Sequence, residues 1–158
     1  MNVDLIVKNA KIYRNGLVLE GGIAVENGKI VAIGKEATLP KGELIVDAGG
    51  NLVLPGLIDV HVHFRDPGFT YKENFLTGSQ AAAAGGVTTV IDEPNNKPAT
   101  ISLEALSQKK RIAKEKALVD YTFSVGLNPQ NLDIIPQFTS QGIVSFDIFD
   151  EGMEELSI

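Results

Sequence analysis

Several features are missing from this chain of 158 residues, and each absence excludes a class of protein. There is no cysteine, which rules out disulfide bonds and metal sites built from thiolates. No apolar stretch reaches the ~18 residues that a membrane-spanning helix needs. The first residues, Met1 to Asp4, lack the basic start and apolar core of a secretion signal. We therefore expect a cytoplasmic protein that does not act on a membrane.

Basic residues are outnumbered, and they are missing from the end of the chain. The 14 Lys and Arg face 20 Asp and Glu, and a formal net charge of −6 argues against a nucleic-acid partner. All basic residues lie between Lys8 and Lys116, whereas residues 117–158 contain seven acids. Two interpretations stay open: a solvated acidic surface, or a surface that faces a basic segment outside this chain.

Residues 1–55 have the pattern of a small β module. Apolar and polar residues alternate with the two-residue period of strands. Asn15-Gly16 and Asn27-Gly28 interrupt this alternation, and Asn-Gly favours the positive φ angles of two-residue hairpin loops. We expect antiparallel hairpins at both places.

From residue 56 onward, strands and helices alternate. The run 57–64 is almost continuously apolar, which predicts a strand buried on both faces of a parallel sheet. A capping box, Thr70 to Glu73, predicts the start of the first helix, and Gly85-Gly86 its end. The later elements are strands at 87–91, 119–126 and 143–149, helices at 102–117 and 131–140, and the start of another helix at 153–156. Such alternation predicts either a (β/α) barrel or an open doubly wound sheet.

The two histidines of the chain form one motif, His61-Val62-His63. Residues two apart on a strand point to the same face, so both imidazoles project together. At the carboxyl end of a parallel strand they would face the mouth of an α/β active site, where imidazole commonly binds zinc. A structural pair is the alternative, but the position at the end of an apolar strand, before Arg65, favours the metal site.

Arg65 and Asn95 are candidates for binding a substrate carboxylate. A guanidinium can hold a carboxylate through two parallel hydrogen bonds, and an amide after the neighbouring strand can donate another. Each residue also has a simpler interpretation. Arg65 could pair on the surface with Asp66 or Glu73, and Asn95 could serve only the turn Pro-Asn-Asn-Lys-Pro.

An ordered set of motifs resembles the opening of the dihydroorotase family, within the amidohydrolase superfamily of metal-dependent barrels. The motifs are DVHVHFRDPG at 59–68, YKE at 71–73, TGSQAAAAGGVTTV at 77–90 and PNN at 94–96. Allantoinases and hydantoinases share the His-x-His motif and the Ala-rich helix, whereas the FRDPG and YKE segments favour dihydroorotases. The resemblance extends over essentially all 158 residues.

This resemblance implies a fold, a reaction and roles for particular residues. The fold is a TIM-type (β/α)8 barrel, of which residues 56–158 would be the first four β/α units. Residues 1–55 would be part of a composite β-sandwich. The reaction is the reversible hydrolysis of dihydroorotate to N-carbamoyl-aspartate in pyrimidine synthesis. His61 and His63 match zinc ligands, and Arg65 and Asn95 match the residues that bind the substrate carboxylate.

The chain departs from the family pattern in two respects. Asp147 stands where many members have a carboxylated lysine on strand four, which excludes a lysine-bridged pair of metals and favours one zinc ion. Asp147 is either a metal ligand or a solvated acid. The further histidine ligands and the general-base aspartate are expected beyond residue 158, because the length is well below the ~250 residues of a complete barrel. We therefore expect no catalysis by these residues alone.

Two other functions remain open at this point. The chain could belong to a non-catalytic, dihydroorotase-like scaffold that binds aspartate carbamoyltransferase. It could also belong to an allantoinase or a hydantoinase. Association into a homo-oligomer is compatible with all three hypotheses.

Overall fold

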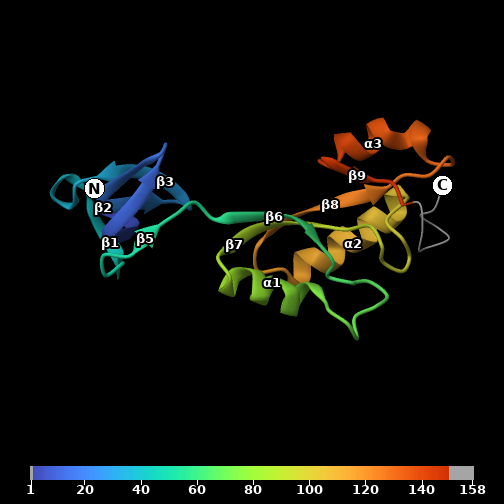
Figure 1. The fold of residues 1–158 in the computed structure, drawn as a ribbon, viewed down its shortest axis with the longest axis horizontal. Coiled ribbons are helices and arrows are strands. Elements are labelled where there is room, and N and C mark those ends of the chain that lie inside the picture. The colour runs from blue at the N-terminus through green and yellow to red at the C-terminus, as the bar shows by residue number, and fades with distance from the viewer. Residues whose placement is uncertain (1, 150–158) are drawn as a thin grey trace. The chain divides into compact units, whose positions relative to one another are not determined.

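The structure is a computed structural model that describes residues 2–149, and the chain divides into two compact units at the Pro55–Gly56 junction. One unit contains only strands and a short 3₁₀ turn, and the other alternates strands with helices (Figure 1). Among the described residues, no helix has both the length and the apolar character needed to cross a membrane.

The N-terminal unit is a single five-stranded sheet around its longest strand, β1. β2 pairs antiparallel with both β1 and β3, whereas β4 and β5 run parallel to β1. The elements are β1 (Asn2–Arg14), β2 (Leu17–Glu26), β3 (Lys29–Gly34), the 3₁₀ turn η1 (Glu36–Thr38), β4 (Lys41–Asp47) and β5 (Leu52–Val53).

Both expected hairpins are confirmed. Asn15 and Gly16, with φ angles of 51° and 80°, connect β1 to β2. Asn27 and Gly28, with φ angles of 50° and 70°, connect β2 to β3. Positive φ at both central residues is the signature of the hairpin turn that matches the twist of two antiparallel strands.

The apolar residues of this unit pack in two clusters along β1 and β2. Val3, Ile6 and Ala24 form one, and Ala10, Ile12 and Ile23 form the other. Residues 2–55 form one sheet, so a composite sandwich with a second layer stays a prediction.

The second unit is a parallel sheet in the order β6-β7-β8-β9, with a helix between successive strands. The alternation of strands and helices and the parallel sheet agree with the expectation from the sequence. The elements are β6 (Leu57–Val62), α1 (Phe75–Ala84), β7 (Val87–Asp92), α2 (Leu103–Lys116), β8 (Asp120–Gly126), η2 (Leu132–Ile134), α3 (Ile135–Ser140) and β9 (Ser145–Asp147).

An aromatic core joins the helices to this sheet. Phe75 at the start of α1 packs edge-on against Phe64, with ring centroids 5.6 Å apart, and against Phe123 of β8 at 6.1 Å. Leu106 of α2 and Phe138 of α3 are fully buried in the same cluster. The core therefore fixes the loop after β6 to the middle of the sheet.

The structure corrects two sequence-based expectations. The first helix begins at Phe75, because Asn74 caps it by accepting hydrogen bonds from the amides of Leu76 and Thr77. The prediction that the capping box at Thr70 starts this helix is therefore wrong. β6 is not buried on both faces, because nothing in the described part of the chain covers the side chains of residues 57–61, which are exposed. The helix start expected at 153–156 lies outside the described residues.

Candidate metal and substrate site

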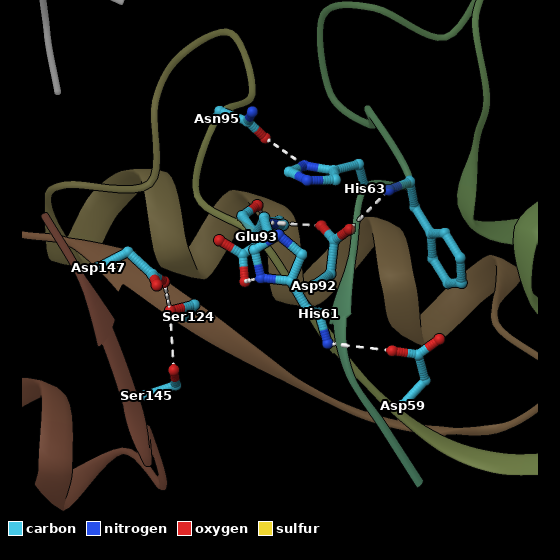
Figure 2. A network of polar contacts seen from close by, with 11 residues as sticks. Asp59, His61, His63, Asp92, Glu93, Asn95, Ser124, Ser145 and Asp147 are labelled. Atoms are coloured by element: carbon cyan, nitrogen blue, oxygen red, sulfur yellow. Dashed lines mark hydrogen bonds and ion pairs between the residues drawn. The ribbon is translucent and has the colours of Figure 1, made fainter. Parts of the chain in front are cut away.

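His61 and His63 lie where β6 ends. His61 is the last residue but one of β6 and His63 directly follows the strand, and their rings lie nearly perpendicular with centroids 5.0 Å apart. β7 runs parallel to β6, so the residues that follow β7 lie at the same end of the sheet as the histidines. Figure 2 shows the two imidazoles between the ends of these strands.

Each imidazole contacts a residue that follows β7 through its Nδ1 atom, His63 by a hydrogen bond and His61 by a charge contact. Asn95 Oδ1 lies 2.9 Å from His63 Nδ1, and Glu93 Oε1 lies 3.2 Å from His61 Nδ1 (Figure 2). An amide oxygen can only accept a hydrogen bond, so Nδ1 of the neutral His63 ring carries the proton, and an ionised Glu93 carboxylate favours the same tautomer at His61. Each Nε2 is then left with a lone pair, which is the form that binds a metal.

A buried ion pair ties helix α2 to both strand ends. Lys109 Nζ lies 2.7 Å from Asp92 Oδ2, and it also donates to the carbonyl oxygen of Glu93 at 2.6 Å. The other carboxylate oxygen of Asp92 accepts from the amide of Phe64 at 2.6 Å. Asp92 and Lys109 are fully buried. This network therefore fixes the backbone after β6, at Phe64, and the backbone after β7, at Glu93.

Glu93 is a buried acid whose charge is only partly compensated. Its side chain is 2% exposed. Burial raises the pKa of Glu93 to about 7, and the nearby Asp147 carboxylate contributes in the same direction. Its Oε1 atom meets His61, whereas Oε2 is buried without a hydrogen-bond partner among the described residues.

Asp147 is the last residue of β9, and its carboxylate accepts a hydrogen bond from the Ser124 hydroxyl of β8. Figure 2 shows Glu93 between His61 and Asp147. The expected acid on strand four is thus close to Glu93, and its carboxylate contacts Glu93 and the Ser124 hydroxyl rather than either histidine.

Arg65 lies two residues after His63 in a left-handed backbone conformation, with φ at 60°. The two acids considered as its surface partners are engaged elsewhere. Asp66 pairs with Lys116 at 2.6 Å, and Glu73 accepts from the amide of Asn74. Neither acid therefore holds the Arg65 guanidinium in this structure.

The described residues form part of a metal site. His61, His63, Glu93 and Asn95 come together, with Asp147 beside Glu93. Within residues 2–149, no three His, Asp or Glu side chains converge as a metal ion would require. The donors fit zinc chemically, because two imidazoles present free Nε2 atoms beside buried carboxylates. They supply a ligand pair rather than a closed shell.

Glu93, Asp92 and Lys109 were missed by reasoning from the sequence. A signal existed for the two acids, since they stand at the carboxyl end of the strand that precedes Asn95. Lys109 also left a signal, because it lies three residues after Leu106 and four before Ala113, on the buried face of α2.

Comparison with known proteins gives the same family from sequence and from structure. The amidohydrolase family profile matches residues 52–132. The dihydroorotase of Methanosarcina mazei is 43% identical over 143 residues, which are 90% of this chain and 31% of that protein. The allantoinase of Streptomyces avermitilis is 39% identical over 123 residues, or 76% of this chain and 28% of that protein.

The L-hydantoinase (dihydropyrimidinase) of Arthrobacter aurescens has the same arrangement of elements. Its structure superposes with a TM-score of 0.91 at 32% identity, covering 99% of this chain and 35% of that one. This chain therefore spans about a third of the length of the relatives that it matches. The fold, the family profile and the level of identity agree, and this chain belongs to the amidohydrolase family.

Proposed function

We propose that the gene product containing this chain is a dihydroorotase-type hydrolase, which reversibly opens the cyclic amide of dihydroorotate to N-carbamoyl-aspartate. The observation that carries this proposal is the pair of imidazoles at the end of β6. Each ring faces an oxygen atom through its Nδ1 atom, which leaves both Nε2 atoms for metal binding. Among the curated relatives, dihydroorotases with about 43% identity over 85–90% of the chain support this substrate class.

Zinc is the metal we propose, with His61 and His63 as two of its ligands and Asp147 as a third. When bound, a divalent metal would supply Lewis acidity that activates water and polarises the amide carbonyl. The residues of this chain would orient the two nitrogen donors. The remaining ligands and the general base would come from chain that lies outside these 158 residues, in a completed (β/α)8 barrel.

Arg65 and Asn95 would bind the substrate carboxylate. Asn95 uses its Oδ1 atom on His63, which leaves its amide N–H groups to donate to an anion. Arg65 is not paired with Asp66 or Glu73, so its guanidinium is available for a bidentate contact. Dihydroorotate has a carboxylate, whereas allantoin and hydantoin do not, so this pair distinguishes the proposal from the two alternatives.

A second candidate is a hydrolase of allantoin or hydantoin, favoured by the TM-score of 0.91 to the hydantoinase and the 39% identity to the allantoinase. The two candidates are separated by assaying the complete gene product with dihydroorotate, allantoin and hydantoin. The proposal predicts the highest kcat/KM for dihydroorotate. Faster turnover of allantoin or hydantoin would overturn it, and no turnover of any would favour the non-catalytic scaffold.

The Arg65→Ala variant tests the carboxylate contact in the same protein. We expect a higher KM for dihydroorotate with unchanged zinc content, because the side chain would bind the substrate and not the metal. Glu104→Gln, a change of an exposed acid on α2, is the matched control and should leave both quantities unaltered. Loss of zinc from Arg65→Ala would show that the arginine has a different role.

A further inference from the structure

We propose that Glu93 is a positioning residue, whose carboxylate holds the Nδ1–H group of His61 and thereby points His61 Nε2 at the metal ion. The inference rests on the proposed metal site but not on which cyclic amide is hydrolysed. Neither the histidine motif nor the carboxylate-binding pair accounts for a buried acid at this position, so Glu93 needs an explanation of its own.

The contact is asymmetric, which makes Glu93 the residue that orients and His61 the residue that is oriented. The two atoms are 3.2 Å apart, and the side chain of His61 is 65% exposed whereas that of Glu93 is 2% exposed. An exposed imidazole is free to rotate about its side-chain torsions. A carboxylate fixed on the inner side of the ring restricts this rotation and selects the tautomer with a free Nε2 atom.

Glu93 is itself anchored through its backbone on two sides. Its amide donates to the carbonyl oxygen of Val62 at 2.9 Å, which continues the pairing of β6 with β7. Its own carbonyl oxygen accepts from the buried Lys109 of α2 at 2.6 Å. The carboxylate therefore starts from a fixed main chain, directly beside the strand that carries His61.

Asn95 and His63 repeat the arrangement two residues further along each segment. Asn95 Oδ1 lies 2.9 Å from His63 Nδ1. Glu93 thus faces His61, and Asn95, two residues later, faces His63, two residues after His61. Outer-shell oxygens on ligand histidines fix ring orientation and raise ligand basicity in metal sites generally. Two such contacts on two neighbouring rings indicate that this segment is built to orient both imidazoles.

A purely structural role explains the burial of Glu93 poorly. Its Oε2 atom has no hydrogen-bond partner in the described part of the chain, and the Asp147 carboxylate is nearby. A buried, incompletely satisfied acid destabilises a fold, and an apolar side chain of similar size would avoid this cost. The contact with His61 supplies a reason to keep the acid.

The first test measures the zinc dissociation constant of the complete gene product by chelator competition, in Glu93→Met and Glu93→Gln. We expect Glu93→Met to weaken zinc binding about 10- to 100-fold, the usual effect of removing such a contact. Glu93→Gln should restore most of the affinity, because an amide oxygen still accepts from Nδ1. Glu104→Gln is the exposed control and should bind zinc like the wild type. Unchanged affinity in Glu93→Met would overturn the inference.

X-ray absorption of the zinc-loaded variants distinguishes an orienting residue from a ligand. We expect the same number of nitrogen and oxygen neighbours in the wild type and in Glu93→Gln. Loss of one oxygen neighbour would make Glu93 a direct ligand and would overturn the positioning role. If the wild type bound no zinc, or if His61→Ala bound it normally, the proposed function would fail as well.

A third measurement needs no variant, and it keeps the inference falsifiable if Glu93→Met does not fold. Nitrogen NMR of histidine-labelled wild-type protein reports which ring nitrogen of His61 carries the proton. We expect the Nδ1–H tautomer, with and without zinc. A predominant Nε2–H tautomer in the metal-free protein would contradict the contact.

Discussion

At the scale of single residues, Lys109 is the clearest case of a charge that the fold must compensate. It is fully buried, forms a 2.7 Å ion pair with Asp92 and lies with Nζ 5.2 Å from the centre of the Phe123 ring. Removing one partner of a buried ion pair leaves the other uncompensated, which typically costs about 3 to 5 kcal/mol. The pair therefore stabilises the fold only as long as both partners are present.

We predict that Lys109→Met lowers the free energy of unfolding by about 3 to 5 kcal/mol, measured by urea denaturation. The double variant Lys109→Met with Asp92→Asn should regain much of this loss, because the amide still accepts from Phe64 and no charge is left unpaired. Lys114→Met, at an exposed position of the same helix, should stay within about 0.5 kcal/mol of wild type. A loss as small as that of Lys114→Met would contradict the account.

Glu93 makes a prediction about pH. Burial, followed by the charge of Asp147, raises the pKa of Glu93 from 4.5 to about 7, so the folded state binds this proton more tightly than the unfolded chain does. Its stabilising contribution is complete below pH 4.5 and is lost as the pH rises through about 7. In metal-free protein, we expect the wild type to lose stability over this interval relative to Glu93→Gln. Urea midpoints that run parallel for the two proteins would contradict this.

At the residue scale, the functional motif was easier to predict than its support. His61, His63 and Asn95 follow strands in a pattern that indicates a common edge, and the structure brings these three together. The burial of Lys109 was not predicted, because helix α2 contains several lysines and the residues next to Lys109 in the sequence do not set it apart. Its burial depends on the packing of α2 against β7 and β8, which is a tertiary effect.

At the scale of elements, helix α1 shows how local signals can compete. Thr70 and Glu73 have the spacing of a capping box, but the chain turns at residues 66–73 and enters the helix only at Phe75. The Asn74 side chain accepts from two helix amides, and Glu73 accepts from the Asn74 amide and from the Thr77 hydroxyl. Placing Phe75 at the first helical position also lets it enter the aromatic core.

We predict that Asn74→Ala lowers the free energy of unfolding by about 1 kcal/mol, the usual cost of losing an N-cap side chain. Thr70→Ala is the matched comparison, because Thr70 is the cap that the sequence pattern favoured and it is exposed. It should change stability by less than about 0.5 kcal/mol. Thermal or urea unfolding of the two variants decides between the two helix starts, and the reverse order of effects would refute the observed cap.

The strand pattern was predictable where periodicity is strong and less so where neighbours decide. The Asn-Gly hairpins need only local backbone preferences, and both formed as expected. The exposure of β6 could not follow from its own residues, because an apolar strand is buried only if something covers it. Leu57, Ile58 and Val60 are 55%, 65% and 62% exposed, because no described residue covers these side chains.

At the scale of the whole molecule, the chain presents the start of a parallel α/β sheet together with a small β unit. Because β6, β7, β8 and β9 are parallel, their carboxyl ends lie at the same end of the sheet. The candidate site residues come from the carboxyl ends of β6, β7 and β9. In the proposed barrel, further strands would cover the exposed side of β6 and supply the missing donors. The family match and the partial ligand set are consistent with this division of the site.

The central claim is that His61 and His63 form the nitrogen half of a zinc site at this end of the sheet. The most direct test is the zinc content of the complete gene product, measured by elemental analysis after dialysis, for wild type, His61→Ala and His63→Ala. Arg65→Ala is the control, because it changes a residue two positions after His63 without removing a proposed ligand. The account predicts that both histidine variants lose most of their zinc while wild type and Arg65→Ala retain it. Full zinc content in either histidine variant would contradict it.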